Sequence, residues 1–130
     1  MDAPAMMRAF LTDTRGATAA EFALVLPLFL ITVFTTINMG LAMSAIVRLH
    51  FVTEKAARCL SVDMTGTCTP ANLNTYARGL YQIGSVSNLT FTPAVLACGN
   101  QVTATGKYNV MFGAGTIPIK ISASACYPII

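Results

Sequence analysis

The sequence contains little charge. Only 10% of its 130 residues are Asp, Glu, Lys or Arg, whereas about a quarter is usual in soluble domains. Five acidic and eight basic residues give a net charge of +3, and the Lys and Arg residues form no cluster. Proteins that bind nucleic acids need such a cluster to displace counterions from the phosphates, so we expect no nucleic-acid partner.

Residues that commonly carry catalysis are also scarce. The chain has one histidine, His50, and the single acidic residue after Cys59 is Asp63. Nucleophilic catalysis needs a base beside the nucleophile, and acid–base catalysis commonly uses a pair of titratable groups. Gly113-Ala114-Gly115 is too short and isolated to indicate a phosphate-binding loop. The sequence therefore predicts a protein that is not an enzyme and needs no cofactor.

The longest stretch without charge runs from Phe22 to Val47. As a helix it would measure about 39 Å at roughly 1.5 Å per residue, which exceeds a hydrocarbon layer of about 30 Å. A secretory signal has an apolar stretch of only about 7 to 15 residues. We therefore expect a transmembrane helix over residues 17–47, preceded by a leader over 1–16 and followed by a small head over 48–130.

Two features of this helix bear on how it packs. Pro27 lies inside the span and cannot donate an N–H to the carbonyl of Ala23, so we expect a kink or local unwinding there. The second half carries small and polar residues, which favour close contact between helices in a membrane. Among them, Asn38 is the best candidate for a hydrogen bond to another helix.

The four cysteines all follow the span. An even number of cysteines in a small region indicates disulfides formed in an oxidising compartment, which places the head outside the cytoplasm. Three pairings are possible, and the spacing favours Cys59 with Cys68 and Cys98 with Cys126. No CxxC pair occurs, and we expect no metal site. The Lys and Arg residues near the span slightly favour the opposite orientation, but we give the cysteines more weight.

The head is predicted to have an α+β fold. The membrane helix continues to about Ser61, because Leu49, Val52, Ala56 and Leu60 recur at helical spacing. A second helix begins after a Thr69 cap, with Leu73, Tyr76, Ala77 and Leu80 on one face and Gly84 at its end.

Alternating residues then predict a sheet of three or four antiparallel strands. Two long strands run from Val102 to Phe112 and from Ile117 to Ala125. One or two shorter strands, interrupted by Pro93, precede a turn at Gly99-Asn100. Pro118 suggests that the last strand begins on an edge or at a bulge.

The start of the span resembles a known motif. Arg15-Gly16-Ala17-Thr18-Ala19-Ala20-Glu21-Phe22, followed by Ala23-Leu24-Val25-Leu26-Pro27, is similar to the N-terminal motif of TadE/TadF-like minor pilins of the tight-adherence (Tad or Flp) branch of type IV pili. The resemblance implies that a prepilin peptidase in the inner membrane cuts between Gly16 and Ala17. It also implies a structural subunit or assembly factor of a pilus used in adhesion. Its partners would be other Tad pilins and the inner-membrane assembly platform.

Physical chemistry gives this motif a rationale. Gly16 permits backbone conformations that other residues avoid, which suits a protease cleft. Cleavage would create an amine at Ala17, one helical turn before Glu21, and an acid is favourable in the first turn of a helix. Glu21 and the adjoining Phe22 are therefore the candidate assembly residues. The alternative is that Glu21 lies at the headgroup level without a partner.

Two other functions fit the same sequence. One is a single-pass membrane-anchored periplasmic binding or sensor domain, whose residues before the span are an ordinary cytoplasmic tail. The other is a secreted disulfide-bonded protein that is cleaved near Ala42-Met43-Ser44 and begins near Ala45.

Overall fold

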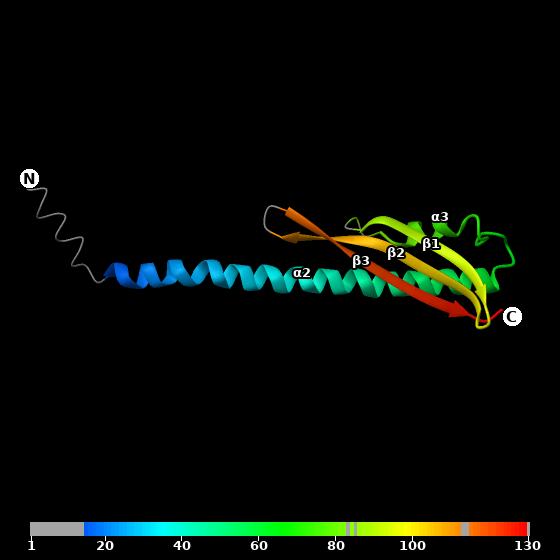
Figure 1. Ribbon diagram of the computed structural model, residues 1–130, viewed down its shortest axis with the longest axis horizontal. Coiled ribbons are helices and arrows are strands. Elements are labelled where there is room, and N and C mark those ends of the chain that lie inside the picture. Colours follow the sequence, from blue (N-terminus) through cyan, green and yellow to red (C-terminus); the bar gives the residue numbers. More distant parts are fainter. Residues whose placement is uncertain (1–14, 83, 85, 113–114, 130) are drawn as a thin grey trace, which may run out of the picture. The chain divides into compact units, whose positions relative to one another are not determined.

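The computed structural model describes residues 15–82, 84, 86–112 and 115–129. Two helices precede three strands (Figure 1): α2 (Arg15–Val62), α3 (Leu73–Leu80), β1 (Val86–Leu96), β2 (Gly99–Phe112) and β3 (Gly115–Tyr127). This arrangement confirms the predicted α+β fold with a long apolar N-terminal helix. The chain divides into two compact units between Ile37 and Asn38.

Helix α2 covers nearly the range that the sequence predicts. Pro27 lies inside it, and the helical assignment continues without a break. The local unwinding expected at Pro27 is therefore not found, because the hydrogen bonds on both sides keep the chain helical around the one missing donor. A kink at Pro27 stays a prediction.

The second part of α2 forms one wall of the head's core. Leu49, Val52 and Ala56 are buried at intervals of three and four residues, as predicted for this face, whereas Leu60 is only partly buried. Ala45, which lies within the predicted span, is buried on the same face. Thr53 is buried among them and donates its hydroxyl hydrogen to the carbonyl oxygen of Leu49 at 2.6 Å. Ala42 and Ile46 also pack against this core, so the packing of the head begins before residue 48.

The antiparallel sheet supplies the opposite wall. Its strand order is β1-β2-β3, and Ala104 of β2 lies opposite both Phe91 of β1 and Ala123 of β3. All three side chains are buried. Gly106 lies on the same face, where a Cβ atom would come within 2.8 Å of the Val86 side chain. Small residues in the middle of the sheet thus allow the large side chains of β1 and the helices to fill the core.

Strand β1 differs from the prediction, because Pro93 does not interrupt it. Two residues earlier, the N–H and C=O of Phe91 point away from β2 and bond to the Asn74 side chain at 2.9 and 3.0 Å. Since backbone direction alternates along a strand, Pro93 also lies on the outer edge, where no N–H is needed. The β1–β2 turn falls at Ala97-Cys98 rather than at Gly99-Asn100.

Helix α3 is shorter than predicted. The predicted cap at Thr69 is wrong, because the helix begins at Leu73 with Asn72 as its N-cap. The Thr69 hydroxyl oxygen instead accepts from the N–H of Asn72 at 3.3 Å, in the turn before the helix. The helix ends at Leu80, four residues before Gly84, because Tyr81 turns into the core and its hydroxyl donates to the carbonyl oxygen of Ala45 at 3.2 Å. Leu80 itself is exposed, so the predicted apolar stripe is only partly buried.

The two edges of the sheet are protected in different ways. Along β1, Asn74 bonds to Phe91, and Arg78 donates to the carbonyl oxygen of Leu89, so α3 covers this edge. The other edge is β3, which carries Pro118 near its start, as the sequence predicts for an edge strand. Lys120 follows it, and charged or proline residues on an edge discourage uncontrolled strand pairing.

Two disulfides close the head. Cys59 bonds to Cys68 with a Cα–Cα distance of 5.7 Å, and Cys98 bonds to Cys126 with a distance of 6.3 Å. This is the pairing that the sequence spacing favours. The first links the end of α2 to the segment before α3, and the second links the β1–β2 turn to the end of β3.

We expect the two disulfides to differ in what they contribute to stability. The Cys98–Cys126 bond closes a loop with a sequence separation of 28, against 9 for Cys59–Cys68. In the chain-entropy model, replacing Cys98 and Cys126 by Ser lowers the free energy of unfolding by about 3.5 kcal/mol, and replacing the other pair lowers it by about 2.5 kcal/mol. Denaturant unfolding of the full chain in detergent measures both. A greater loss from the Cys59–Cys68 pair would contradict this order.

Candidate functional site

The predicted cleavage junction lies in the first turn of α2. The helix begins at Arg15, so the bond between Gly16 and Ala17 belongs to a helical turn and not to an extended segment. The N–H groups of a first turn have no partner within the helix, so this turn unwinds more easily than the interior. Gly16 has nothing within 4 Å of the position that a Cβ atom would take.

Glu21 lies one turn further along the same helix. Residues four apart in a helix are neighbours on one face, so Glu21 lies on the side of the backbone of Ala17. Its side chain and that of Phe22 are exposed. The geometry therefore leaves Glu21 accessible to an amine at residue 17 of the same chain or of another.

The apolar residues after Glu21 form an exposed surface. Every residue from 18 to 37 is exposed, including Phe22 at 65% and Leu24 at 81%. In the described part of the chain, α2 is the one helix that is long and apolar enough to cross a membrane. Lipid or other apolar helices must cover this surface, since large apolar patches are not stable in water.

The threonines of this segment bond to their own helix. Thr32, Thr35 and Thr36 each donate the hydroxyl hydrogen to a backbone carbonyl oxygen one turn earlier, at 2.7 to 2.8 Å. Such bonds satisfy the polar groups of a membrane helix internally. These hydroxyls therefore do not require a second helix, although their small size still permits a close approach.

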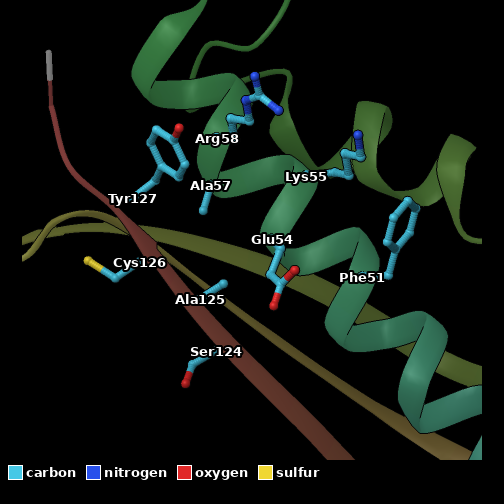
Figure 2. Close-up of a pocket in the computed structure, with 9 residues that line it drawn as sticks. All are labelled: Phe51, Glu54, Lys55, Ala57, Arg58, Ser124, Ala125, Cys126 and Tyr127. Carbon is cyan, nitrogen blue, oxygen red and sulfur yellow. The ribbon is translucent and has the colours of Figure 1, made fainter.

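A groove lies between α2 and β3 in the head (Figure 2). Its volume is about 410 Å³, and it is open to solvent. Its lining residues are Phe51, Glu54, Lys55, Ala57, Arg58, Ser124, Ala125, Cys126 and Tyr127. Lys55 places its ammonium group 5.5 Å from the centre of the Phe51 ring. The lining includes both charge signs, but Ser124 has no histidine beside it in this set, so the groove favours binding over nucleophilic catalysis.

Asp63 organises the loop after α2. Its carboxylate accepts hydrogen bonds from the N–H and hydroxyl of Thr65 and from the N–H of Cys68. These bonds, that of the Thr65 hydroxyl first, hold the pKa of Asp63 below its ordinary value of 3.8. The one sign of this loop in the sequence is an aspartate before a Thr-rich, Gly-containing segment.

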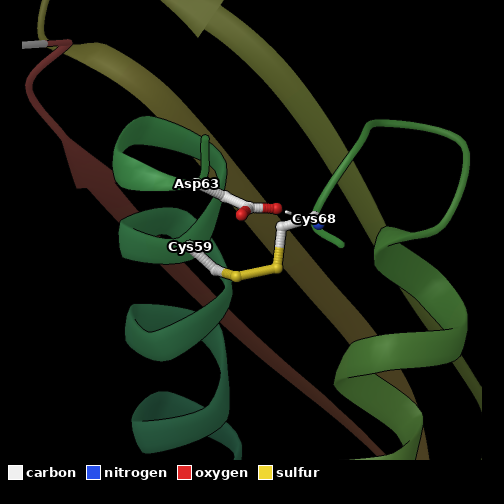
Figure 3. Close-up of side chains that lie close together, drawn as sticks. All are labelled: Cys59, Asp63 and Cys68. Carbon is white, nitrogen blue, oxygen red and sulfur yellow. Dashed lines mark hydrogen bonds between the residues drawn. A yellow bond between two sulfur atoms is a disulfide. The ribbon is translucent and has the colours of Figure 1, made fainter. Parts of the chain in front are cut away.

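Cys59, Asp63 and Cys68 lie close enough together to suggest a metal site (Figure 3). The two sulfur atoms, however, are bonded to each other, and a disulfide does not supply the thiolates that metals bind. The carboxylate is also engaged by the loop. This cluster is therefore a structural staple that joins α2 to the segment before α3.

Sequence reasoning also missed the contacts that fix the sheet to the end of α2. The Asn100 side-chain amide donates to the Ser61 hydroxyl at 3.1 Å and to the carbonyl oxygen of Leu60 at 3.4 Å. The Ser61 hydroxyl in turn reaches the carbonyl oxygen of Tyr127. Only the tertiary fold brings these residues together, so no local pattern could have predicted them.

These features define a class of protein: a chain with one apolar helix fit for membrane anchoring, which continues into a small, disulfide-bonded α+β head. Residues 16–58 match the model of the TadE-like protein family. The match covers the predicted junction, the apolar helix and the part of α2 that packs in the head, and it confirms the resemblance seen in the sequence. It supports a protein associated with the Tad pilus. No curated protein and no solved structure matches the chain.

The hydrogen bonds of Asp63 predict how its loop responds to pH. Because its pKa is lowered on folding, the stability that the carboxylate contributes is fully present above pH 3.8 and is lost as the pH falls through the lowered pKa. An NMR titration of the full chain in micelles should show the amides of Thr65 and Cys68 shifting with a midpoint below 3.8. In an Asp63→Asn variant these shifts should vanish. A midpoint above 3.8 would contradict the assignment.

Proposed function

We propose that this chain is a minor pilin or pseudopilin, a structural subunit or assembly factor of a Tad-type pilus used in surface adhesion. The observation that carries the proposal is the TadE-like match over residues 16–58, which includes both the junction and the apolar helix. In this account a prepilin peptidase removes residues 1–16, and the protein acts without catalytic residues or a cofactor. Its partners are other pilins and the assembly platform of the inner membrane.

The apolar part of α2 is compatible with two successive environments, the lipid bilayer and a bundle of subunit helices. Its exposed apolar surface from residue 18 to 37 can be covered by lipid before assembly and by the helices of other subunits afterwards. Both coverings are apolar, so the transfer does not expose this surface to water. The hydroxyls of Thr32, Thr35 and Thr36 are already hydrogen-bonded within α2, so they need no partner from either environment.

Glu21 can determine the axial position, or register, that a subunit takes in the bundle. A carboxylate among apolar helices is costly unless it meets a cation, and cleavage at Ala17 supplies one. In a bundle of subunits, the Glu21 side chain of one chain then favours the one axial position at which it meets an amine. Phe22 would pack beside it, and a kink at Pro27 would help the helix adapt to its neighbours.

The disulfides support a head outside the cytoplasm. Both bonds lie after the apolar helix, and such bonds persist in oxidising compartments such as the periplasm. We therefore place the protein in the inner membrane as a single-pass subunit with its head in the periplasm, from which it can enter an extracellular pilus.

One observation favours a second function. The open groove beside Glu54, Lys55 and Arg58 could hold a polar ligand or peptide in an anchored periplasmic binding or sensor domain. Such a protein would keep its leader and would work equally well with another membrane helix in place of residues 17–37. A pilus subunit would not, because its own helix packs in the assembly.

The role of Glu21 can be tested by one substitution. Glu21→Gln removes the charge and keeps the size, so it should lower the amount of this subunit in sheared pili about tenfold if the ion pair contributes about 1.4 kcal/mol to each insertion. Immunoblots of pilus and membrane fractions measure this ratio. The total amount of protein in the cell should stay the same.

Glu54→Gln is the matched control, because Glu54 is an exposed acid of the same helix in the head. It should leave recruitment unchanged. Equal recruitment of the Glu21→Gln variant and the unaltered chain would refute the register role. An effect of equal size from Glu54→Gln would point to the groove instead.

A further inference from the structure

Two segments of the chain, one in α2 and one in the β2–β3 hairpin, carry no charge, and cations mark where each of them ends. In α2 no residue from Phe22 to Val47 is charged, and Arg48 is the first that is. In the β2–β3 hairpin, Lys107 and Lys120 are cross-strand partners, and no residue from Tyr108 to Ile119 is charged. The two segments are far apart in the sequence, so they form one uncharged surface only if the fold brings them to the same level.

Contacts between α2, Tyr81 and β2 show how high Arg48 and the Lys107–Lys120 pair lie along the head. The Tyr81 hydroxyl donates to the carbonyl oxygen of Ala45 at 3.2 Å. Burial raises the pKa of Tyr81, while Tyr108 raises it further and Arg48 lowers it, so both residues lie within electrostatic reach of that hydroxyl. Lys107 precedes Tyr108 in β2. Geometry gives the same level: from the Asn100–Ser61 contact, Lys107 lies about 23 Å along β2 and Arg48 lies about 20 Å back along α2, so the lysine pair and Arg48 lie at a similar height on the head.

The hairpin continues from this level toward the apolar part of α2. Strand β2 starts beside the end of α2, where Asn100 bonds to Ser61. Tyr108 lies about 26 Å further along the strand, which corresponds to about 17 helical residues before Ser61 and so to the level of Ala45. Met111 lies about 10 Å further, which corresponds to about seven residues of helix before Ala45. Asn38 and Ala42, the first partly buried residues of α2 in the described chain, lie within this stretch.

The end of the hairpin exposes large apolar side chains. Met111, Ile117 and Ile119 are 67%, 54% and 48% exposed. Ile117 pairs with Val110 and Ile119 with Tyr108, so both lie on the face of the sheet that packs against α2, while Met111 lies on the opposite face. We call these three residues the apolar tip. Because apolar side chains are exposed on both faces, the tip is most stable where an apolar medium covers both faces.

A bilayer would provide such surroundings. A hydrocarbon layer of about 30 Å takes up about 20 helical residues, so a span that begins at Phe22 ends near Leu41. The apolar tip lies beside that end of the span. Lys and Arg side chains commonly mark the interface between hydrocarbon and headgroups, and here Arg48, Lys107 and Lys120 lie behind the tip.

We propose that the apolar tip of the β2–β3 hairpin inserts into the outer interfacial layer of the membrane that α2 spans, with Arg48, Lys107 and Lys120 at the level of the lipid phosphates. The head is then held to the bilayer at two points, the helix and the hairpin, and is restricted in tilt and rotation. This inference requires that α2 spans a membrane, but it does not depend on assembly into a pilus.

Lipid fits this surface better than a second copy of the chain does. A second copy that covered the tip would bring its own Lys107 and Lys120 toward the same cations, and like charges at close range repel. Lipid phosphates carry the opposite charge and are present along the whole edge of the tip. The charge pattern thus selects the bilayer as the occupant.

The absence of tryptophan from the chain allows a direct test. Met111→Trp and Ile117→Trp each place one fluorophore on the apolar tip, on opposite faces of the sheet. Both positions are exposed, so the larger ring can be accommodated. Ser124→Trp is the matched control, because Ser124 is exposed on the same strand as Ile117 and about 23 Å further along it.

The full-length variants are reconstituted in vesicles of phosphatidylcholine and phosphatidylglycerol, with and without phosphatidylcholine brominated near the headgroup end of its chains. At positions 111 and 117 we expect blue-shifted emission and about twofold quenching by the brominated lipid, as for side chains at an interface. At position 124 we expect no quenching. Circular dichroism of each variant checks that the head is folded.

Two results would overturn the proposal. Equal, weak quenching at all three positions, with equal access to aqueous acrylamide, would place the tip in water. Blue-shifted emission at positions 111 and 117 without quenching by the brominated lipid would mean that protein covers the tip, which favours a second copy over the bilayer. Neither result would bear on cleavage at Gly16 or on recruitment to a pilus.

Discussion

The fold depends on the way the sheet buries one face of α2. Leu49, with Val52 and Ala56 on the same face, contacts a core that also contains Phe91 and Val102, and all five side chains are at most 3% exposed. Burial of a large apolar side chain contributes about 1.5 to 3 kcal/mol. Without this face the sheet would have one open side, and a head of this size has no second core to replace it. The disulfides and the Asn74 and Arg78 bonds to β1 then fix the elements that this packing brings together.

The same helix therefore has two kinds of surface along its length. From Phe22 to Ile37 its residues are exposed and uncharged, and after Ala42 one face belongs to the core of the head. A helix continuous from Arg15 to Val62 can transmit a pull or a rotation on one part to the other. In the proposed account this is its use, since extraction of the apolar part from lipid has to carry the head with it.

Local pattern predicted the elements whose formation depends on local sequence. The uncharged run from Phe22 to Val47 predicted the first part of α2 by its length. The period of three to four residues predicted its continuation into the head, and the alternation from Val102 onward predicted β2 and β3, because burial on one face requires those periods. The predicted interruption of β1 at Pro93 is wrong, because a proline breaks a strand only where the neighbouring strand needs an N–H. The contact of α3 with Phe91 shows that Pro93 lies on the outer edge, and the sequence alone does not reveal this contact. The end of α3 was misplaced for a similar reason, because a tertiary contact of Tyr81 outweighed the signal of Gly84.

The residues of the candidate site also divide into those that a local pattern reveals and those that only the tertiary fold brings together. The motif at Gly16, Ala17 and Glu21 could be found in the sequence because it is contiguous, whereas the groove joins segments of α2 and β3 that are distant in the chain. The central claim is that the chain is a processed, pilin-like subunit. The mass of the protein isolated from its native membranes, with and without the prepilin peptidase, tests this most directly. The account predicts a chain that begins at Ala17 only when the peptidase is present, whereas an intact Met1 or a start near Ala45 would contradict it.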